Sequence, residues 1–472
     1  MKTSRFLIVI FLASCFVHLI PAIAMFKMPI GLDDMFQYDM LARSIVSGNG
    51  YRWYAQEDLK LIREFLPIEI PKDYDPKGVL TSFRGPGYPV FLALIYWIFG
   101  TGTDRIGYAR VIQAIVMATL APLTWWLARE MGFGEKTRRW AAVVMAFFPL
   151  LLAYPLALAS ENLFIVLVTL SLIFLLRANN NGRILDYALA GILAALTVLT
   201  RSIVSGFLVL GVIWLLWKPP DWKKAIIGSI LFVLCFAVMT LPWAWRNSRL
   251  HGKPTWVETS LGYNLYMGYH PKSSGTFQFG ISLDLIPILD DAERDQRGIE
   301  AAMNFIREDP ARVPYLMIRK AGYMWGLDKR ALIFFYGNGF LGKWPPAMVV
   351  LVFLLDALPM VILTPLASFG LVCGNMDRQK GLIALMIGYY TFIHMLVMAD
   401  ARFHIPLVPI IAVLAIYAVV EKPWRFSSRW RVYCAAGIVG LLFINWGVEV
   451  ARDWNILVKL FGPEGYRINL PY

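Results

Sequence analysis

Two adjacent carboxylates, Asp33 and Asp34, follow the first apolar block of the sequence, residues 6–28. A carboxylate at the exit of an apolar segment can act as a general base that accepts the proton of an attacking hydroxyl or amine. An aspartate ahead of residues 39–45 also suits the N-cap of a helix. The residues alone leave catalysis and helix capping open at this position.

One further carboxylate, Glu161, and three arginines stand beside other apolar blocks. Glu161 lies in a very short connection, where capping the next helix is the alternative to a role in chemistry. Arg84 precedes an apolar stretch and could bind a lipid phosphate. The alternative is that its long side chain only extends to the lipid headgroups, as arginines commonly do. Arg201 and Arg402 could bind an anionic partner. Alternatively, each could serve to align the end of a helix.

Carboxylates and arginines on one face of a membrane suit one chemistry well. A sugar linked to a polyprenyl phosphate carries its own leaving group, so positive charge is needed to stabilise the departing phosphate. A carboxylate must also take the proton of the attacking group. Because the carrier lipid stays in the bilayer, the site must open sideways at the membrane surface. The residues therefore predict a glycosyltransferase that uses a polyprenyl-phosphate-linked sugar.

Long apolar blocks make up most of the chain. Of its 472 residues 58% are hydrophobic and 16% are charged, whereas soluble domains carry about 25% charged residues. A helix that crosses a bilayer needs about 20 mostly apolar residues. We predict an all-α polytopic membrane protein with about eleven transmembrane helices, at residues 6–28, 106–128, 140–156, 162–176, 185–199, 203–217, 225–245, 346–372, 382–398, 403–420 and 432–448.

The basic residues of the short loops predict the orientation of the chain. With a cytoplasmic N-terminus, the inner loops hold most of the loop Lys and Arg, and the short outer loops hold little besides Arg201 and Arg402. This asymmetry is what the positive-inside rule requires. The net charge of +13 is therefore a topology signal, and we expect no nucleic-acid partner.

Two long segments, residues 29–105 and 246–345, fall on the outer face in this orientation. Residues 86–99 of the first are apolar but short for a span, so we expect a juxtamembrane helix in the outer interface. The second is expected to form a small loop region or lid. The predicted organisation is an N-terminal transmembrane catalytic module over residues 1–245, the lid over 246–345, and C-terminal transmembrane helices over 346–472.

The order and placement of these motifs resemble the C-type glycosyltransferase superfamily, in the branch that contains protein mannosyltransferases and the lipid A aminoarabinose transferase. Asp33-Asp34 is similar to the first outer loop of that branch, and Glu161 follows a stretch like its second acidic loop. The remaining matching motifs are Arg84-Gly85-Pro86-Gly87-Tyr88-Pro89, Leu199-Thr200-Arg201, Gly262-Tyr263-Asn264-Leu265-Tyr266-Met267-Gly268 and Arg402-Phe403-His404-Ile405-Pro406. Asp34 stands where the aminoarabinose branch has Glu, and Glu161 where it has Asp.

The resemblance implies a role for each matching residue. Asp33 is the expected base, with Asp34 beside it, and Glu161 helps to place the acceptor or a metal. The residues expected to bind the carrier phosphate and sugar are Arg84, Tyr88, Arg201, Tyr263, Asn264 and Arg402. Displacement of the phosphate by an acceptor on the opposite side would invert the anomeric carbon. A divalent cation, Mg²⁺ or Mn²⁺, between Asp33 and Glu161 suits oxygen ligands and is left unassigned.

Two other classes of protein remain as alternatives. A lipid or solute transporter or flippase would place ionisable groups near the middle of the bilayer, and Asp356 is the one residue that fits this pattern. A scaffold that binds the carrier lipid without reacting is the other. Outward-facing chemistry favours a prokaryotic plasma membrane, and the acceptor can be a lipid, a glycan or a protein.

Overall fold

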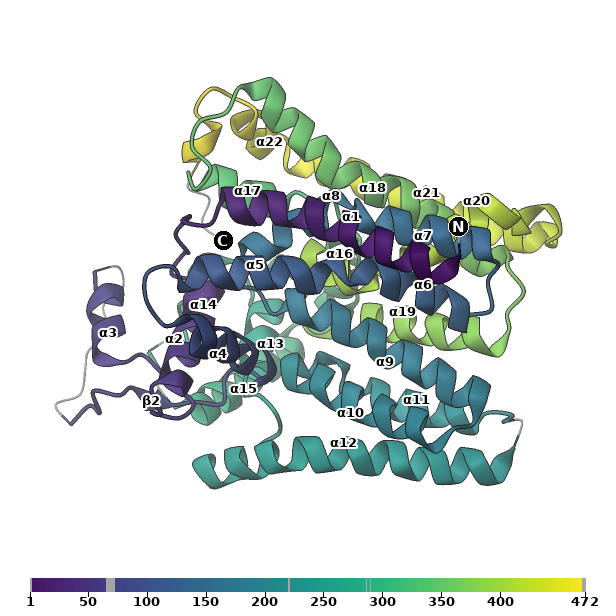
Figure 1. Ribbon diagram of the computed structural model, residues 1–472. Helices are drawn as coiled ribbons and strands as arrows, with labels where there is room; N and C mark the ends of the chain where they lie inside the picture. Colours follow the sequence, from purple (N-terminus) through teal and green to yellow (C-terminus); the bar gives the residue numbers. More distant parts are fainter. Residues whose placement is uncertain (1, 65–72, 220, 286, 289, 469–472) are drawn as a thin grey trace.

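Long helices that lie side by side form the body of the protein (Figure 1). The computed structural model describes residues 2–64, 73–219, 221–285, 287–288 and 290–468. Helices suit these apolar sequences because, in hydrocarbon, each backbone N–H and C=O must be satisfied within its own segment. The body contains α1 (Thr3–Ala24), α5 (Arg105–Ala118), α6 (Leu120–Glu130), α7 (Glu135–Ala146), α8 (Pro149–Ala153), η1 (Tyr154–Leu156), α9 (Glu161–Asn181), α10 (Ile184–Thr200), η2 (Ser202–Val204), α11 (Phe207–Leu216), α12 (Trp222–His251), α18 (Pro346–Cys373), α19 (Arg378–Leu396), η3 (Ala401–Leu407), α20 (Val408–Glu421), η4 (Pro423–Arg425) and α21 (Arg429–Arg452).

The predicted class, an all-α polytopic membrane protein, is confirmed, but the predicted number of spans is not. Seven helices of the described residues are long and apolar enough to cross a membrane, or eight if the pair α7 and α8–η1, bent by 44°, is one span. Each of the eleven predicted blocks coincides with a helix or a bent pair. Helix α10 has 17 residues and spans about 26 Å, short of the ~30 Å hydrocarbon core. Helices α11 and α19 also lie outside the set of seven.

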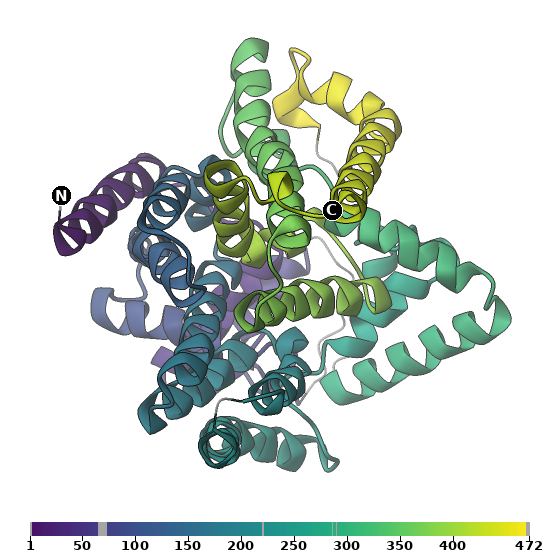
Figure 2. The ribbon, with the colours of Figure 1, turned by 90° about the vertical axis from the view of Figure 1, so that its right-hand side faces the viewer.

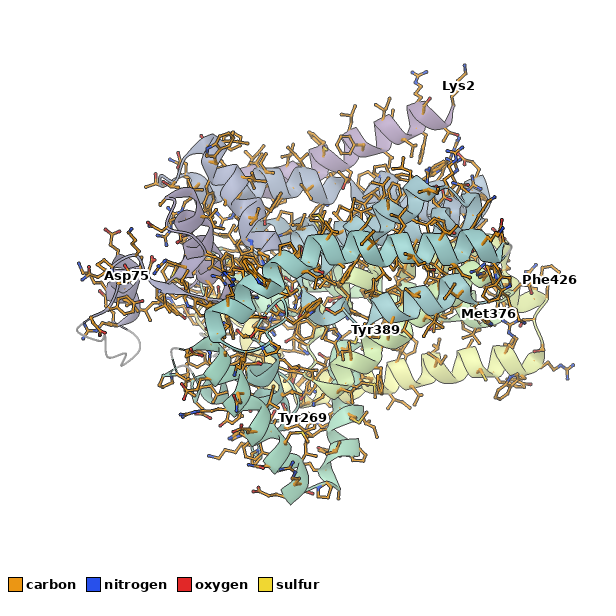
Figure 3. All side chains as sticks on the ribbon, turned by 90° about the horizontal axis from the view of Figure 1, so that it is seen from below. Lys2, Asp75, Tyr269, Met376, Tyr389 and Phe426 are labelled. Carbon is orange, nitrogen blue, oxygen red and sulfur yellow. The ribbon has the colours of Figure 1, made fainter. Side chains whose placement is uncertain are left out.

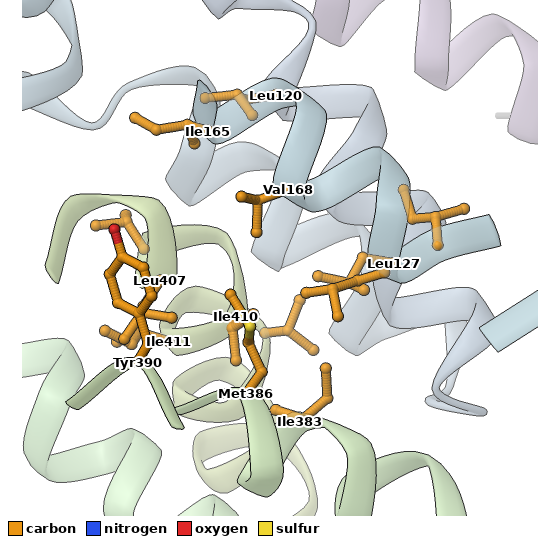
Figure 4. Packing of buried hydrophobic residues seen from close by; sticks show 14 of the residues in the cluster. Leu120, Leu127, Ile165, Val168, Ile383, Met386, Tyr390, Leu407, Ile410 and Ile411 are labelled. Atoms are coloured by element: carbon orange, nitrogen blue, oxygen red, sulfur yellow. The ribbon is translucent and has the colours of Figure 1, made fainter. Parts of the chain in front are cut away.

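Helix α20 is the centre of the bundle. Of the apolar stretch that includes it, 83% is buried inside the protein, against 28% for α1 and 22% for α21. Ile410 and Ile411 of α20 join Leu127 of α6, Val168 of α9 and Met386 of α19 in one buried cluster (Figure 4). The helices with low burial expose apolar side chains on the outside of the bundle, as expected where lipid replaces water.

The two long segments predicted to share a face lie together at one end of the bundle, opposite the N-terminus (Figure 1). We call this end the loop end. In Figure 2, which looks along the bundle, two of its helices, α15 and α16, project to one side. Its elements are α2 (Asp34–Val46), β1 (Arg52–Trp53), α3 (Gln56–Ile62), β2 (Val79–Leu80), α4 (Gly87–Phe99), α13 (Leu261–Tyr269), α14 (Phe279–Ser282), α15 (Asp291–Glu308), α16 (Arg312–Met324), α17 (Arg330–Gly337), α22 (Trp454–Leu460) and η5 (Gly465–Arg467), with β1 and β2 paired antiparallel.

Helix α4 is the predicted juxtamembrane helix. Its 13 residues span about 20 Å, too short to cross a bilayer. One face, including Tyr88 and Tyr96, is buried against α2 and α5, and the other exposes Leu94, Trp97 and Ile98. The apolar exposed face is compatible with the membrane interface, and the location of α4 there stays a prediction.

Two buried charged residues fix the elements that carry the first carboxylates. The Asp39 carboxylate of α2 accepts hydrogen bonds from Tyr96 of α4 at 2.9 Å and from Arg105 of α5 at 2.8 Å. Arg110 of α5 donates to the carbonyl oxygens of Met25 at 2.9 Å and Met28 at 2.6 Å, just after α1. Buried polar groups need such partners, so the connection from α1 to α2 has one defined path.

Candidate active site

A cavity of about 150 Å³ opens at the loop end of the bundle. It brings together all three carboxylates predicted from the sequence, Asp33, Asp34 and Glu161. One predicted arginine, Arg402, also lines it. The other lining residues are Met35, Tyr38, Ala153, Tyr154, Ala157, Leu158, Ala159, Phe277, Arg330, Ala331, Phe334 and Phe335. The cavity therefore has charged groups of both signs beside an aromatic wall.

Asp33 is a helix N-cap and also faces the cavity, and a catalytic role for it stays a prediction at this point. Its Oδ1 accepts a hydrogen bond from the Met35 N–H at 2.8 Å, so Asp33 is the N-cap of α2. The carboxylate also faces the cavity. Although the side chain is open to that cavity, the surrounding protein displaces bulk water. This desolvation, together with the charge of Asp34, raises the pKa of Asp33 to about 6.

Asp34 is paired with arginine, and its pKa is shifted in the opposite direction from the pKa of Asp33. It forms an ion pair with Arg84, whose Nε also donates to the Gln37 amide oxygen at 3.0 Å. Arg402 approaches the second Asp34 oxygen at 3.7 Å. Desolvation opposes ionisation, but Arg84 and then Arg402 outweigh it and lower the pKa of Asp34 to about 2. A tightly paired, acidic carboxylate is a poor base, so Asp33 is the better candidate.

Glu161, the first residue of α9, forms an ion pair with Arg201 at 2.6 Å. The Arg201 guanidinium also packs over the rings of Phe164 and Phe403, at 5.8 and 5.5 Å from their centroids. Arg201 and Arg84 are not among the residues that line the cavity. Both arginines instead contact carboxylates that do line it.

The cavity contains a second arginine, Arg330, that the sequence analysis missed. Arg330 begins α17 and pairs with Asp400. The same Asp400 carboxylate accepts a hydrogen bond from the Arg402 N–H at 3.1 Å. Asp400 thereby joins the two cavity arginines. Arg330 lies in the long segment 246–345, which holds many Lys and Arg. The charge asymmetry of short loops does not apply to a segment of this length, so no local signal marks Arg330.

Arg402 has donor capacity left for a ligand. Its Nε is buried without a hydrogen-bond acceptor among the residues that the structure describes. A buried donor without a partner is costly, which favours an anion beside it. Arg402 and Arg330 thus make the positive part of the cavity, and Asp33 is a carboxylate available on the same surface.

Besides Arg84 and Arg201, three further residues predicted to bind substrate lie outside the cavity lining. The Tyr88 ring is fully buried and nearly perpendicular to the Tyr38 ring, and its hydroxyl donates to the Gln113 side-chain oxygen at 2.5 Å. Tyr263 of α13 donates to the Ser282 carbonyl oxygen at 3.1 Å. Asn264 follows on the same helix. Tyr88 contacts the cavity through Tyr38, and a binding role for the three residues stays a prediction.

The cavity offers a poor set of ligands for a divalent cation. Within the described ranges, no group of three or more His, Cys, Asp or Glu residues is placed to hold a metal ion. Asp34 and Glu161 are each paired with an arginine, and Arg330 and Arg402 add positive charge. A cation bridging Asp33 and Glu161 would have to compete with these guanidinium groups, so these residues do not fit a divalent cation.

The fold and cavity define a polytopic membrane protein with a polar site at one end of its bundle, and two comparisons relate it to known proteins. Residues 84–245, about a third of the chain, match the family model described as dolichyl-phosphate-mannose-protein mannosyltransferase. No match was found among curated protein sequences.

Two solved structures share the fold. One is the oligosaccharyltransferase of Archaeoglobus fulgidus in complex with Zn and sulfate, with a TM-score of 0.50 and 15% identity over 98% of this chain and 53% of that protein. The other is ArnT from Cupriavidus metallidurans bound to undecaprenyl phosphate, with a TM-score of 0.50 and 11% identity over 98% of this chain and 65% of that protein. The chain thus spans about half to two thirds of the length of these proteins. The resemblance to the C-type glycosyltransferases is confirmed.

Proposed function

We propose that the protein transfers a sugar from a polyprenyl-phosphate carrier to an acceptor hydroxyl or amine, with Asp33 as the base. One observation carries this proposal. A carboxylate with a pKa raised to about 6 shares a cavity with two arginines, Arg330 and Arg402. A base of this pKa is suited to proton transfer near neutral pH. The arginines suit the phosphate that leaves.

The reaction proceeds as one displacement at the anomeric carbon. The acceptor oxygen or nitrogen attacks that carbon while its proton passes to Asp33. The bond between the carbon and the phosphate oxygen breaks, and the electron pair stays on the phosphate beside Arg402 and Arg330. Attack opposite the phosphate inverts the configuration. In this scheme Arg84 and Arg201 act through Asp34 and Glu161, and a product with retained configuration would contradict it.

The proposed location is a prokaryotic plasma membrane, with the N-terminus in the cytoplasm and the cavity on the outer face. The donor reaches the cavity from the bilayer, and the acceptor is a lipid, a glycan or a protein. The undecaprenyl phosphate bound to ArnT, which shares the fold, supports a carrier of this chemistry. The mannosyltransferase family model over residues 84–245 supports transfer of a sugar.

Turnover by the purified protein in detergent tests the proposal. We would supply a panel of polyprenyl-phosphate-linked sugars and measure release of polyprenyl phosphate. The wild type and the control Asp73→Asn, an exposed carboxylate at the same end, should turn over, and Asp33→Asn should be slower by about 10²–10⁴-fold.

Two results would contradict this proposal. Normal turnover by Asp33→Asn would exclude Asp33 as the base. No turnover with the whole panel, together with movement of lipid or solute across vesicles, would favour a transporter.

A further inference from the structure

Glu258 joins the two loops that carry Arg84 and Arg201. It lies between α12 and α13, outside the residues matched by the family model. One carboxylate oxygen accepts from the Gly85 N–H at 3.3 Å. The other accepts from the Ser202 N–H at 3.3 Å and from the Ser202 hydroxyl. The residue after each arginine is therefore held by the same side chain.

The backbone around Glu258 is anchored on both sides. The carbonyl of Val257 accepts hydrogen bonds from the Trp243 indole at 2.9 Å and the Asn247 amide at 3.1 Å, both on α12. The next residue, Thr259, donates its N–H to the Ser82 carbonyl at 2.9 Å. These bonds leave Glu258 between the two loops, with little freedom to turn away.

The two loops also touch directly. A Cβ atom added to Gly85 would lie 2.4 Å from the Leu199 carbonyl oxygen, and one added to Gly87 would lie 2.5 Å from the Thr200 hydroxyl. The loop after Arg84 therefore packs against the end of α10. The backbone contact sets how close the loops are, and Glu258 fixes them to each other across this contact.

This junction connects the partners of two cavity carboxylates. Arg84 pairs with Asp34, and Arg201 pairs with Glu161. A shift of one loop relative to the other would move one ion pair relative to the other. Glu258 is absent from the cavity lining, so it acts on the site through these arginines.

We infer that Glu258 is a positioning residue, which fixes the Asp34–Arg84 and Glu161–Arg201 pairs relative to each other in the cavity. The inference rests on the proposed function for its effect on turnover. The junction itself does not depend on the reaction. Misplacement of reacting groups by about 1 Å can lower a rate on the order of a hundredfold, so a residue outside the cavity can matter for transfer.

Amide hydrogen exchange in detergent tests the junction without any substrate. In Glu258→Ala, peptides that contain Gly85 and Ser202 should exchange faster, while peptides from α18 and α20 should not change. Glu258→Gln keeps one acceptor oxygen and should be intermediate. Glu300→Ala, an exposed glutamate on α15, is the control and should match the wild type. Unchanged exchange at both peptides in Glu258→Ala would overturn the junction.

Turnover of the same variants tests the positioning role. Glu258→Ala should lose on the order of tenfold to a hundredfold in kcat/KM, and Glu258→Gln should recover part of it. Faster exchange with wild-type turnover would overturn the positioning role. Failure of the wild type to use any donor would contradict the proposed function instead, and exchange would still decide whether the junction exists.

Discussion

At the scale of single residues, two neighbouring aspartates have different properties because their surroundings differ. Asp34 is paired with Arg84, and its pKa is about 2, whereas desolvation raises the pKa of Asp33 to about 6. Opposite charges favour ionisation and desolvation disfavours it. Of the two, Asp33 can take up a proton near neutral pH, and Asp34 remains ionised.

The first prediction is an acid limit on activity set by Asp33. A base must be unprotonated, so kcat/KM should be constant above about pH 6 and should fall about tenfold for each pH unit below it. Asp34 is one cause of the raised pKa, so Asp34→Asn should move the limit to lower pH. The measurement is the pH dependence of kcat/KM. A limit that stays near pH 6 in Asp34→Asn would show that another group titrates.

The second prediction concerns Arg330. Arg330→Ala should lower kcat by about 10²–10³-fold, because it removes a donor to the departing phosphate and the ion pair with Asp400. Arg330→Lys keeps the charge but loses the planar guanidinium, so its kcat should lie between those of the wild type and Arg330→Ala. Steady-state turnover and inhibition by polyprenyl phosphate are the readouts. Arg297→Ala, an exposed arginine of α15, is the control. Equal inhibition constants for Arg330→Ala and the wild type would place the phosphate elsewhere.

At the scale of elements, short connections between helices build the site. The turn Gly85-Pro86-Gly87 leads into α4 and packs on the end of α10. A Cβ atom at either glycine would clash with that end, so the turn has no room for a side chain there. Asp39 and Arg110 fix α2 and the end of α1 from the side of α5. The catalytic candidates thus sit on helix ends and turns that a packed scaffold holds in place.

The third prediction tests this close packing. Gly85→Ala should lower the free energy of unfolding by about 1–3 kcal/mol, as expected when a well-packed site is overfilled. It should also lower turnover, because the loop that carries Arg84 must shift. Gly102→Ala in the same long segment meets no atom within 4 Å and should leave both nearly unchanged. Thermal unfolding in detergent is the measurement. Equal stability of the two variants would mean that the Leu199 contact yields easily.

At the scale of the whole molecule, the cavity and the N-terminus lie at opposite ends of the bundle. Lys2 and Phe426 lie toward one end and Asp75 toward the other (Figure 3). The cavity is lined by residues of the loop end, among them Asp34 of α2 and Arg330 of α17. Helix α20 fills the centre with apolar side chains. Such a molecule is suited to chemistry at one membrane surface.

The fourth prediction is the sidedness of these ends. The four native cysteines, Cys15, Cys235, Cys373 and Cys434, would first be replaced by serine. A membrane-impermeant maleimide should then label Asp75→Cys in intact cells, because the positive-inside rule puts the loop end outside. Phe426→Cys, at an exposed position, should react only after the membrane is permeabilised. The reverse pattern would place the cavity in the cytoplasm.

Much of this protein was predictable from its sequence. Apolar blocks along the chain predict helices that cross a membrane, because burial of about 20 consecutive apolar residues is a local requirement of the bilayer. The same reasoning, with the distribution of Lys and Arg, predicted that residues 29–105 and 246–345 share one end. Charged residues beside the apolar blocks, together with the order of their motifs, pointed to Asp33, Asp34, Glu161 and Arg402, which the structure brings into one cavity.

Only the tertiary structure decided which charges meet. Arg330, Asp400 and Glu258 carry no local signal of a shared site, since their partners lie elsewhere in the chain. The structure also gives the predicted arginines different places. Arg402 lines the cavity, whereas Arg84 and Arg201 form ion pairs with the cavity carboxylates Asp34 and Glu161. Hydropathy is a property of consecutive residues. The pKa of a carboxylate and the partner of an arginine depend on which loops pack together, and that is determined by the fold.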